Sequence, residues 1–317
     1  MRILLTGGAG FIGSHLGGAL VRRGDQLVIL DHFLPLAETA RKEHQLREED
    51  LLGGDLPVEI VRGDLRDAAL LARLLPSVDA VVHLAALAGV RDSLADPLLY
   101  ESVNVHGTLV LLQAMREAGC RKLVFASSSS VYGAREGEGG FHEDEPADRP
   151  VSPYAATKRA GELFCHAAHA HWGLDVSCLR FFTVYGPRQR PTMAIARFID
   201  LALHDRPLPV FGDGSSLRDY TYIDDIVRGV LASLDRLRGF EVINLGCGDP
   251  ILLRELVEAI GAAVGRPIRI ERHPEQAGDV PRTHADIGRA RRLLDWQPQV
   301  ALLRGLAETV AWQRRQG

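Results

Sequence analysis

Short apolar runs alternate with longer amphipathic segments through the first 180 or so residues, and this alternation limits the possible folds more than any other feature. The runs are nearly continuous in Val, Ile and Leu, as strands buried on both faces are. Predicted strands lie at 3–7, 27–31, 58–64, 80–86, 122–128 and 176–182. Predicted helices between them include 11–23, 97–118 and 153–172. The alternation predicts an α/β fold with a doubly wound parallel sheet.

The alternation of strands and helices ends after residue 182, where Gly- and Pro-rich segments such as YGPRQRP and VFGDGSS interrupt it. A later apolar run, EVINLG at 241–246, is predicted to return to the main sheet. We therefore expect a first domain over 1–182 with this strand added. A smaller, interleaved α/β domain is expected over most of 183–317.

Composition excludes several classes of protein. The 317 residues are 46% hydrophobic and 25% charged, which is ordinary for a globular chain. A net charge of −4 without a basic block argues against nucleic acid or a membrane surface as partner. The apolar runs are too short for a secretory signal or a membrane span. Four scattered cysteines suit a reducing cytosol, so a cytoplasmic protein is expected: Cys120, Cys165, Cys178 and Cys247.

The sequence predicts no metal centre. No Cys or acid completes a convincing ligand set with His166, His169 and His171, and these histidines suit the negative end of a helix. Asp224 and Asp225 are interpreted as helix-capping residues.

A glycine motif follows the first predicted strand. In GGAGFIG, Gly7, Gly10 and Gly13 are spaced by three and come directly before a helix. Gly7 permits a sharp turn, Gly10 permits close approach of a pyrophosphate, and Gly13 permits close packing of helix and strand. The helix N-terminus adds unsatisfied donors and partial positive charge. The motif in this context predicts a dinucleotide-binding fold of the Rossmann type.

Two acidic residues follow predicted strands. Asp31 ends the second strand, where a carboxylate can accept from the adenosine ribose and repels an added 2′-phosphate. The next residues, His32 and Phe33, supply no Arg or Lys for such a phosphate, so NAD is preferred to NADP. Asp64 closes the third strand and either reaches the adenine or caps a helix.

Tyr154 and Lys158 are candidates for an acid–base pair. Ser152 and Pro153 are typical of a helix start, and residues four apart share a helix face. Near a nicotinamidium, a Lys ammonium stabilises the phenolate and lowers the tyrosine pKa. The hydroxyl-rich turn FASSSSVYG is expected at the carboxyl edge of the sheet, where doubly wound folds bind ligands.

These and other segments resemble one known family. TGGAGFIGSHL, HLAALAGV, SSSSVYG, YAATK, RFFTVYGPRQRP, FGDGSSLRDYTYIDD and AGDVPRTHAD occur in the order typical of the extended short-chain dehydrogenase/reductase family. They are most similar to its NAD-dependent nucleotide-sugar 4-epimerases. The similarity covers nearly the whole chain.

The resemblance implies roles for individual residues. Tyr154 would be the catalytic acid and base, Lys158 would hold the nicotinamide ribose, and Ser128 would be the catalytic hydroxyl. Ser130 would be a second sugar contact. Nucleotide-sugar 4,6-dehydratases have an Asp-Glu pair where this chain has Ser129 and Ser130, which argues against water elimination. The implied NAD contacts are Gly7, Gly10, Phe11, Ile12, Gly13, Asp31, Asp64, Leu65, Leu84, Ala85, Ala86, Asn104, Tyr154, Lys158 and Phe181.

The implied reaction inverts carbon 4. Tyr154 takes the proton of the 4-hydroxyl while the C4 hydride passes to NAD, the 4-keto sugar turns over, and the hydride returns to its other face. NAD is regenerated in each cycle and is expected to stay bound.

The segment FFTVYGPRQRPTMA bears on the sugar. Many UDP-glucose 4-epimerases have Asn at the position of Thr183. The combination of Thr183 and Arg190 resembles the UDP-glucuronate 4-epimerases. This chain departs from their usual pattern at Thr192, where they have Asp. A 4-keto uronate loses carbon dioxide readily, and an Arg fork with a Thr hydroxyl can hold its carboxylate. Alternatively, Arg188 and Arg190 are loop charges or pyrophosphate contacts. UDP-glucuronate is preferred over UDP-glucose or UDP-N-acetylglucosamine.

Other residues are implied for the nucleotide half and for assembly. Arg218 resembles the diphosphate-binding Arg, Asp279 the uridine-ribose contact, and Arg282 a further phosphate contact. Phe211 lines the base pocket or belongs to the core, and Asn104 either fixes its helix near the nicotinamide or caps a turn. Helices 97–118 and 153–172 resemble the family's dimer helices, so a homodimer is expected. The alternatives are a uronate decarboxylase, a nucleotide-sugar reductase or an NAD-sensing protein without enzymatic activity.

Overall fold

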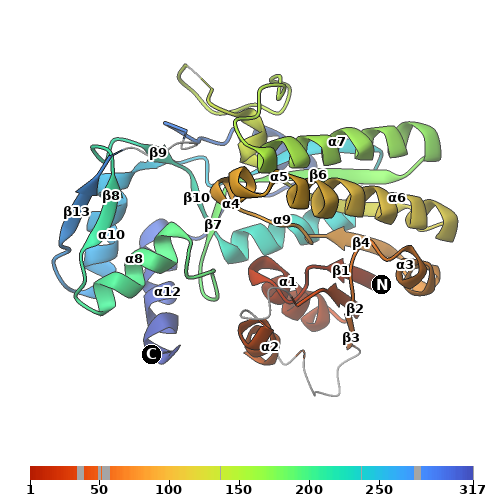
Figure 1. The fold of residues 1–317 in the computed structure, drawn as a ribbon, viewed down its shortest axis with the longest axis horizontal. Coiled ribbons are helices and arrows are strands. Elements are labelled where there is room, and N and C mark those ends of the chain that lie inside the picture. The colour runs from red at the N-terminus through yellow and green to blue at the C-terminus, as the bar shows by residue number, and fades with distance from the viewer. Residues whose placement is uncertain are drawn as a thin grey trace.

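Seven strands of the described chain form one parallel sheet in the computed structural model (Figure 1). The structure describes residues 1–33, 39–48, 51, 58–135, 137–236, 238–274 and 280–316. The strand order is β11-β6-β5-β4-β1-β2-β3, which reverses direction between β1 and β4. The strands are β1 (Arg2–Thr6), β2 (Gln26–Asp31), β3 (Val58–Arg62), β4 (Ala80–His83), β5 (Lys122–Ser128), β6 (Asp175–Phe181) and β11 (Phe240–Leu245). The doubly wound sheet, including the return of β11, is as predicted.

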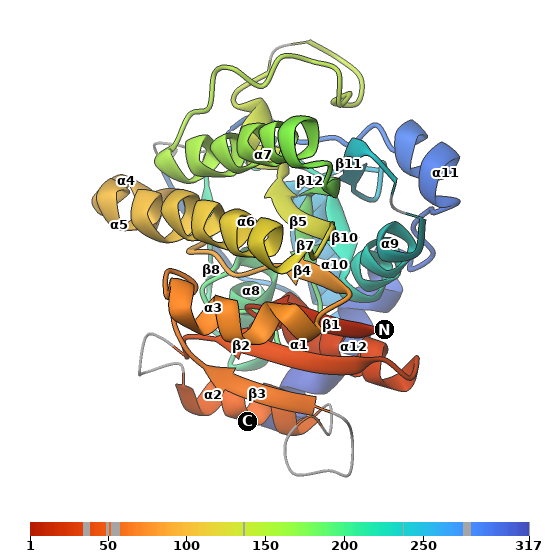
Figure 2. The ribbon, with the colours of Figure 1, turned by 90° about the vertical axis from the view of Figure 1, so that its right-hand side faces the viewer.

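Helices cover both faces of the sheet (Figure 2). Alternate strand residues point to opposite faces: Ile3 and Leu5 face one apolar cluster, and Leu4 faces the other. The first face is covered by α1 (Phe11–Arg22), α2 (Thr39–Glu48) and α9 (Ile223–Arg236). The second face is covered by α3 (Ala68–Leu74), α6 (Gly107–Ala118) and α7 (Pro153–Trp172). Short 3₁₀ helices lie at Leu75–Ser77 and Ser129–Tyr132.

One predicted helix differs in detail. The segment predicted as a single helix at 97–118 consists of α5 (Pro97–Tyr100), a π-helix (Glu101–His106) and α6, and α4 (Val90–Ala95) precedes it. The wider turn carries Asn104, whose side chain bonds both backbone polar groups of Leu87. Such π segments occur frequently at functional sites.

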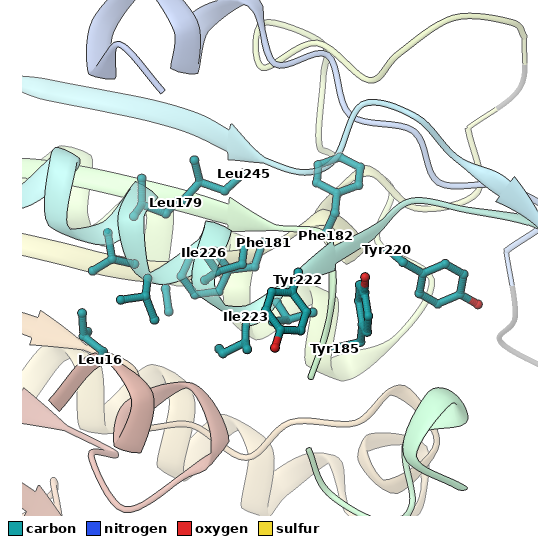
Figure 3. Close-up of a cluster of buried hydrophobic side chains, with 14 of the residues drawn as sticks. Leu16, Leu179, Phe181, Phe182, Tyr185, Tyr220, Tyr222, Ile223, Ile226 and Leu245 are labelled. Carbon is teal, nitrogen blue, oxygen red and sulfur yellow. The ribbon is translucent and has the colours of Figure 1, made fainter. Parts of the chain in front are cut away.

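The C-terminal region is smaller and consists of short elements, seen at the left of Figure 1. Its two-residue to four-residue strands pair as β10 with β7, β12 with β9, and β13 with β8. An apolar cluster containing Phe181, Phe182, Tyr185, Tyr220 and Tyr222 joins this region to the main sheet (Figure 3). The elements are β7 (Thr183–Tyr185), α8 (Ala194–Leu203), β8 (Leu208–Phe211), β9 (Leu217–Arg218), β10 (Tyr220–Tyr222), β12 (Ile251–Leu252), α10 (Leu253–Val264), β13 (Ile270–His273), α11 (Gly288–Leu294) and α12 (Leu302–Gln316).

Candidate active site

The predicted site residues lie mostly at the carboxyl edge of the main sheet. Because all seven strands are parallel, Gly7 after β1, Asp31 at the end of β2 and Ser128 at the end of β5 reach the same edge. The strand order reverses between β1 and β4, and the carboxyl edge at such a reversal is the usual ligand position in these folds.

The glycine turn has the geometry that a dinucleotide pyrophosphate requires. Gly7 has φ +72°, and a Cβ there would lie 2.7 Å from the backbone nitrogen of Ala85. A Cβ at Gly13 would lie 2.3 Å from the Gly7 carbonyl oxygen, so helix and strand touch. Gly10 is the N-cap of α1 and brings no side chain to the first N–H groups of the helix, which include those of Phe11 and Ile12. These residues fit NAD.

Asp31 is already part of a hydrogen-bonded network. Its carboxylate accepts from the backbone N–H groups of Ala9 (3.1 Å) and Phe33 (2.8 Å) and from the Lys42 ammonium (2.9 Å). Lys42 belongs to α2, eleven residues along the chain, and the sequence reasoning missed it because only the residues next to Asp31 were considered.

Asp64 does not cap the helix that follows it. Its oxygens accept from the Arg66 guanidinium and backbone N–H, and these bonds lower its pKa to about 2. The N-cap of α3 is Asp67, which accepts from the Leu70 N–H. The capping alternative for Asp64 is therefore wrong. Leu65 beside it is buried and lies under Gly107.

Asn104 supports the loop that follows β4. Its amide oxygen accepts from the Leu87 N–H (2.8 Å), and its amide nitrogen donates to the Leu87 carbonyl and to the Thr157 hydroxyl (3.0 Å each). Thr157 lies on α7 between the two candidate catalytic residues. Asn104 thus joins α7 to the loop holding Leu84, Ala85 and Ala86. Of the remaining predicted contacts, Phe181 ends β6 at the same edge.

Tyr154, Lys158 and Ser128 come together. Ser152 caps α7 by accepting from the Ala155 N–H, which fixes the helix start expected from the sequence. The phenol of Tyr154 is hydrogen-bonded to Ser128. The Lys158 ammonium donates to the Ala126 carbonyl (2.8 Å) and lies 6.0 Å from the centre of the Tyr154 ring.

The charge states of this group differ in one respect from expectation. Burial raises the pKa of Tyr154, while the hydrogen bond with Ser128 and the charge of Arg190 act to lower it. The Lys158 ammonium is directed to the Ala126 carbonyl rather than to the phenol. Burial also lowers the pKa of Lys158 to about 8. Near neutral pH the lysine is therefore mostly charged and the tyrosine is protonated.

Ser130 lies beside Ser128. Its hydroxyl and its backbone N–H both donate to the Ser128 hydroxyl, at 2.9 and 3.2 Å. Ser130 is therefore linked to the phenol through Ser128.

A small cavity of about 120 Å³ brings two predicted substrate residues together, Thr183 and Arg218. Its lining also includes Gln189, Met193 and Tyr220, which the sequence reasoning missed. Gln189 is buried and bonds the Val184 carbonyl and the Ala196 N–H, so it holds this loop against α8. No motif distinguishes these three side chains in the sequence alone.

The two arginines of the 183–193 segment have different environments. Arg188 is buried with φ +66° and donates to the His15 ring and the Gln45 carbonyl, so it packs against α1 and α2. Arg190 points the other way, toward the Ala88 carbonyl (3.4 Å), and its charge acts on Tyr154. Only Arg190 faces the catalytic group.

The remaining predicted substrate residues are spread over the C-terminal region. Phe211 stacks on His273 (5.2 Å between ring centres), and the Arg91 guanidinium lies 5.7 Å above its ring. Arg282 donates to the carbonyls of Gly137 and Gly139, so its guanidinium binds the loop that holds these two glycines. Asp279 lies outside the described residues.

Asp219, next to Arg218, is a buried carboxylate that the sequence reasoning missed. It accepts from the backbone N–H groups of Cys247 (2.7 Å), Gly248 (2.9 Å) and Ala285 (3.0 Å). Its own carbonyl accepts from the Thr183 N–H. One residue therefore ties together the end of β11, the 283–285 segment and both sides of the small cavity.

A larger hollow of about 620 Å³ lies elsewhere, between α9, α11 and residues 295–299, and none of the predicted site residues lines it. Within the described ranges, no three His, Cys, Asp or Glu side chains are grouped as metal ligands. None of the helices described is both long and apolar enough to span a membrane.

Comparison with known proteins identifies the family. Residues 3–246 match the model of the NAD dependent epimerase/dehydratase family, which is more than three quarters of the chain. The chain belongs to this family. It is therefore an NAD-dependent enzyme of the nucleotide-sugar epimerase type, and its cofactor is NAD. Extended short-chain dehydrogenase/reductase membership, expected from the motifs, is confirmed.

Individual family members are similar over their whole length. A UDP-glucuronate 4-epimerase of Thermodesulfobacterium geofontis is 41% identical over 98% of this chain and 95% of its own. A UDP-glucose 4-epimerase of Mycolicibacterium smegmatis is also 41% identical, over 99% of both chains. The crystal structure of UDP-glucuronic acid 4-epimerase from Bacillus cereus with UDP-glucuronic acid and NAD has a TM-score of 0.92 and 36% identity, covering 100% of each chain.

Proposed function

We propose that this family member inverts carbon 4 of UDP-glucuronate, giving UDP-galacturonate through a transient 4-keto sugar. The observation that supports the chemistry best is the group formed by the Tyr154 phenol, the Ser128 hydroxyl and the Lys158 ammonium at the carboxyl edge of β5. Bound at the glycine turn of Gly7, Gly10 and Gly13, NAD would supply the hydride-accepting and hydride-donating ring for carbon 4.

Tyr154 would move the proton of the 4-hydroxyl in both directions. A base must lie within hydrogen-bond reach of that proton, and Ser128 is placed to share the same oxygen. Burial alone raises the pKa of the phenol, so the nearby cations are needed to make proton removal practicable at neutral pH. Lys158 and Arg190 are the cations of this site.

Arg190 supports glucuronate as the sugar. The carboxylate of a uronate is carried by carbon 5, the neighbour of carbon 4, so a cation whose charge acts on Tyr154 is close to where that carboxylate would lie. An Arg fork can bind a carboxylate with two parallel bonds, and the Thr183 hydroxyl can add a third. Held in this way, the β-keto acid intermediate keeps its carboxylate out of the orientation that releases carbon dioxide.

UDP-glucose is the second candidate substrate, since a relative of equal identity carries that name. Thr183 and Arg218 share one cavity, and Thr183 can bind a 6-hydroxyl as well as a carboxylate. UDP-N-acetylglucosamine is a weaker alternative.

The test is incubation of the purified protein with UDP-glucuronate and, separately, with UDP-glucose, followed by NMR of the products. We expect UDP-galacturonate as the main product, with kcat/KM for UDP-glucuronate the larger and no carbon dioxide released. Faster conversion of UDP-glucose to UDP-galactose would assign the second substrate. A UDP-pentose with carbon dioxide would make the protein a decarboxylase.

We also propose a homodimer formed through α5, α6 and α7. Leu98 on α5 and Leu163 and Phe164 on α7 are exposed, at 79%, 55% and 37%. Apolar side chains gathered on neighbouring helices are typical of a protein interface. Light scattering at micromolar concentration should give twice the mass of the 34.7 kDa chain, and a monomer would contradict this.

Two further expectations remain proposals. A cytoplasmic location is supported by four free thiols, three of them buried. A division at residue 182, with β11 belonging to the first part, is supported by its pairing with β6.

A further inference from the structure

The face of α7 that carries Tyr154 and Lys158 carries a third ionisable side chain one turn further on, Glu162. Residues four apart share a helix face, so the three side chains form a row. Tyr154 and Lys158 have roles in the proposed reaction. Glu162 is only 1% exposed and has none in that reaction.

The row bonds to the last residues of β5. Lys158 donates to the Ala126 carbonyl (2.8 Å), and the Glu162 carboxylate accepts from the Ser127 hydroxyl (2.6 Å). The following residue, Ser128, is hydrogen-bonded to the phenol. Three turns of α7 therefore bond to three consecutive residues at the catalytic end of one strand.

Glu162 is itself held by two arginines. Arg180 on β6, 2% exposed, donates through Nε to Oε1 and through Nη2 to Oε2, at 2.8 Å each. Arg159 adds a bond of 2.9 Å to Oε2. A planar fork on a carboxylate fixes orientation as well as distance. Glu162 thus connects α7 to β5 and β6 at once.

The packing allows α7 little freedom to shift. A Cβ placed on Gly161 would lie 2.4 Å from the ring of Phe125 on β5, so the helix backbone already touches the strand at this turn. Arg180 also packs against an aromatic side chain, because its guanidinium lies 4.7 Å above the Tyr132 ring. Loss of the Glu162 bonds would leave a buried guanidinium without its carboxylate, and the helix would have to adjust.

We propose that Glu162, held by Arg180, is a positioning residue for the epimerase reaction: it fixes α7 on β5 so that the phenol of Tyr154 meets Ser128. Its carboxylate oxygens are bonded to Ser127, Arg159 and Arg180. The inference rests on the proposed function, since it assigns Glu162 to the geometry of that chemistry.

The first variant is Glu162→Gln, which keeps the shape of the side chain but places an N–H₂ donor against the arginine donors. Displacement of a catalytic group by about 1 Å can cost about 100-fold in rate. We expect kcat to fall about 10-fold to 100-fold, while KM for the UDP-sugar and the Kd for NAD change less than about twofold. The kinetic isotope effect of C4-deuterated substrate should increase, because hydride transfer becomes slower relative to product release. An unchanged kcat overturns the proposal.

Asp225→Asn is the matched control. Asp225 is a buried carboxylate on α9, across the sheet from α7, and it pairs with Arg228 and accepts from the Gln299 and Val300 N–H groups. Its loss should lower the melting temperature but leave kcat per folded molecule unchanged. Equal effects of both variants on kcat and KM would mean that Glu162 contributes stability alone, and would overturn the proposal.

Two more variants complete the test. Glu162→Asp keeps the charge but is one carbon too short to reach Ser127 and Arg180 together, so its kcat should remain low. A normal kcat would show that charge alone matters and would overturn the proposal. If Glu162→Gln does not fold, Ser127→Ala removes only the bond to β5, and kcat should fall several-fold at constant KM. A wild-type kcat in Ser127→Ala overturns the proposal. Failure of the wild-type protein to epimerise any UDP-sugar would instead overturn the proposed function.

Discussion

The candidate chemical group and the candidate substrate contacts are built on different kinds of element. Tyr154 and Lys158 lie on a 20-residue helix, and Ser128 ends a seven-residue central strand. Thr183, Phe211 and Arg218 lie on strands of three, four and two residues. The first set is held by a sheet and a buried ion pair, and the second by short segments that pair across the chain.

This difference suggests that the long elements determine the reaction and the short segments determine which sugar is bound. Atoms that must meet within a fraction of an ångström are placed by rigid elements, whereas the segments around them can vary without disturbing the sheet. Relatives named for glucuronate and for glucose are equally similar to this chain, as expected if the chemistry is shared and the substrate contacts differ. The following changes test this division.

The largest effect is expected for the catalytic group on α7 and β5, which we call the rigid side. Tyr154→Phe removes the proton carrier and should lower kcat at least about 1000-fold, within the range general acid–base catalysis contributes. NAD binding should persist, because the glycine turn is unaffected. Turnover is followed by NMR and bound NAD by mass spectrometry of the native protein. Tyr222→Phe, which loses a phenol bonded to Glu308 on α12, is the control and should keep nearly full activity. Near-normal turnover of the Tyr154 variant would contradict the division.

A selective effect is expected on the substrate side. Arg190→Gln removes the charged fork, and a charge-assisted hydrogen bond is worth about 1.5–3 kcal/mol. We expect kcat/KM for UDP-glucuronate to fall about 10-fold to 150-fold, and that for UDP-glucose to fall much less. The measured quantity is the ratio of the two kcat/KM values. Arg197→Gln, an exposed position on α8, should leave the ratio unchanged. An equal loss of kcat/KM with both substrates would mean that Arg190 acts on the catalytic base Tyr154 or binds the diphosphate.

A smaller effect concerns stability and pH. Burial lowers the pKa of Lys158 from 10.5 to about 8, so the folded protein loses this proton near pH 8 while the unfolded chain retains it. Above pH 8 the unfolded state binds more protons, and this lysine makes stability rise with pH. Lys158→Met should remove that rise. The difference in unfolding free energy between wild type and variant should then change by up to about 1.4 kcal/mol per pH unit between pH 8 and 10. Urea unfolding of both proteins at several pH values gives this difference. If the two unfolding free energies change with pH in parallel, burial does not lower the pKa of Lys158.

The rigid side could be predicted from the sequence, and the other side only in part. Apolar runs and the spacing of Tyr154 and Lys158 sufficed for the sheet and for α7, because period and local spacing are visible in one sequence. Lys42, Asp219 and the Arg282 contacts could not be found in this way, since their partners lie 11 to 145 residues away. The π-helix at 101–106 was missed because the bonds that Asn104 makes to Leu87 are a tertiary feature.

The central claim is that hydride leaves carbon 4 and returns to its other face without meeting solvent. The direct test is conversion of UDP-glucuronate deuterated at carbon 4 in ordinary water, with NMR of the product. We expect UDP-galacturonate that retains the deuterium at carbon 4, and the same reaction in heavy water with unlabelled substrate should introduce none. Loss of the label to solvent, or product without inversion at carbon 4, would contradict the account.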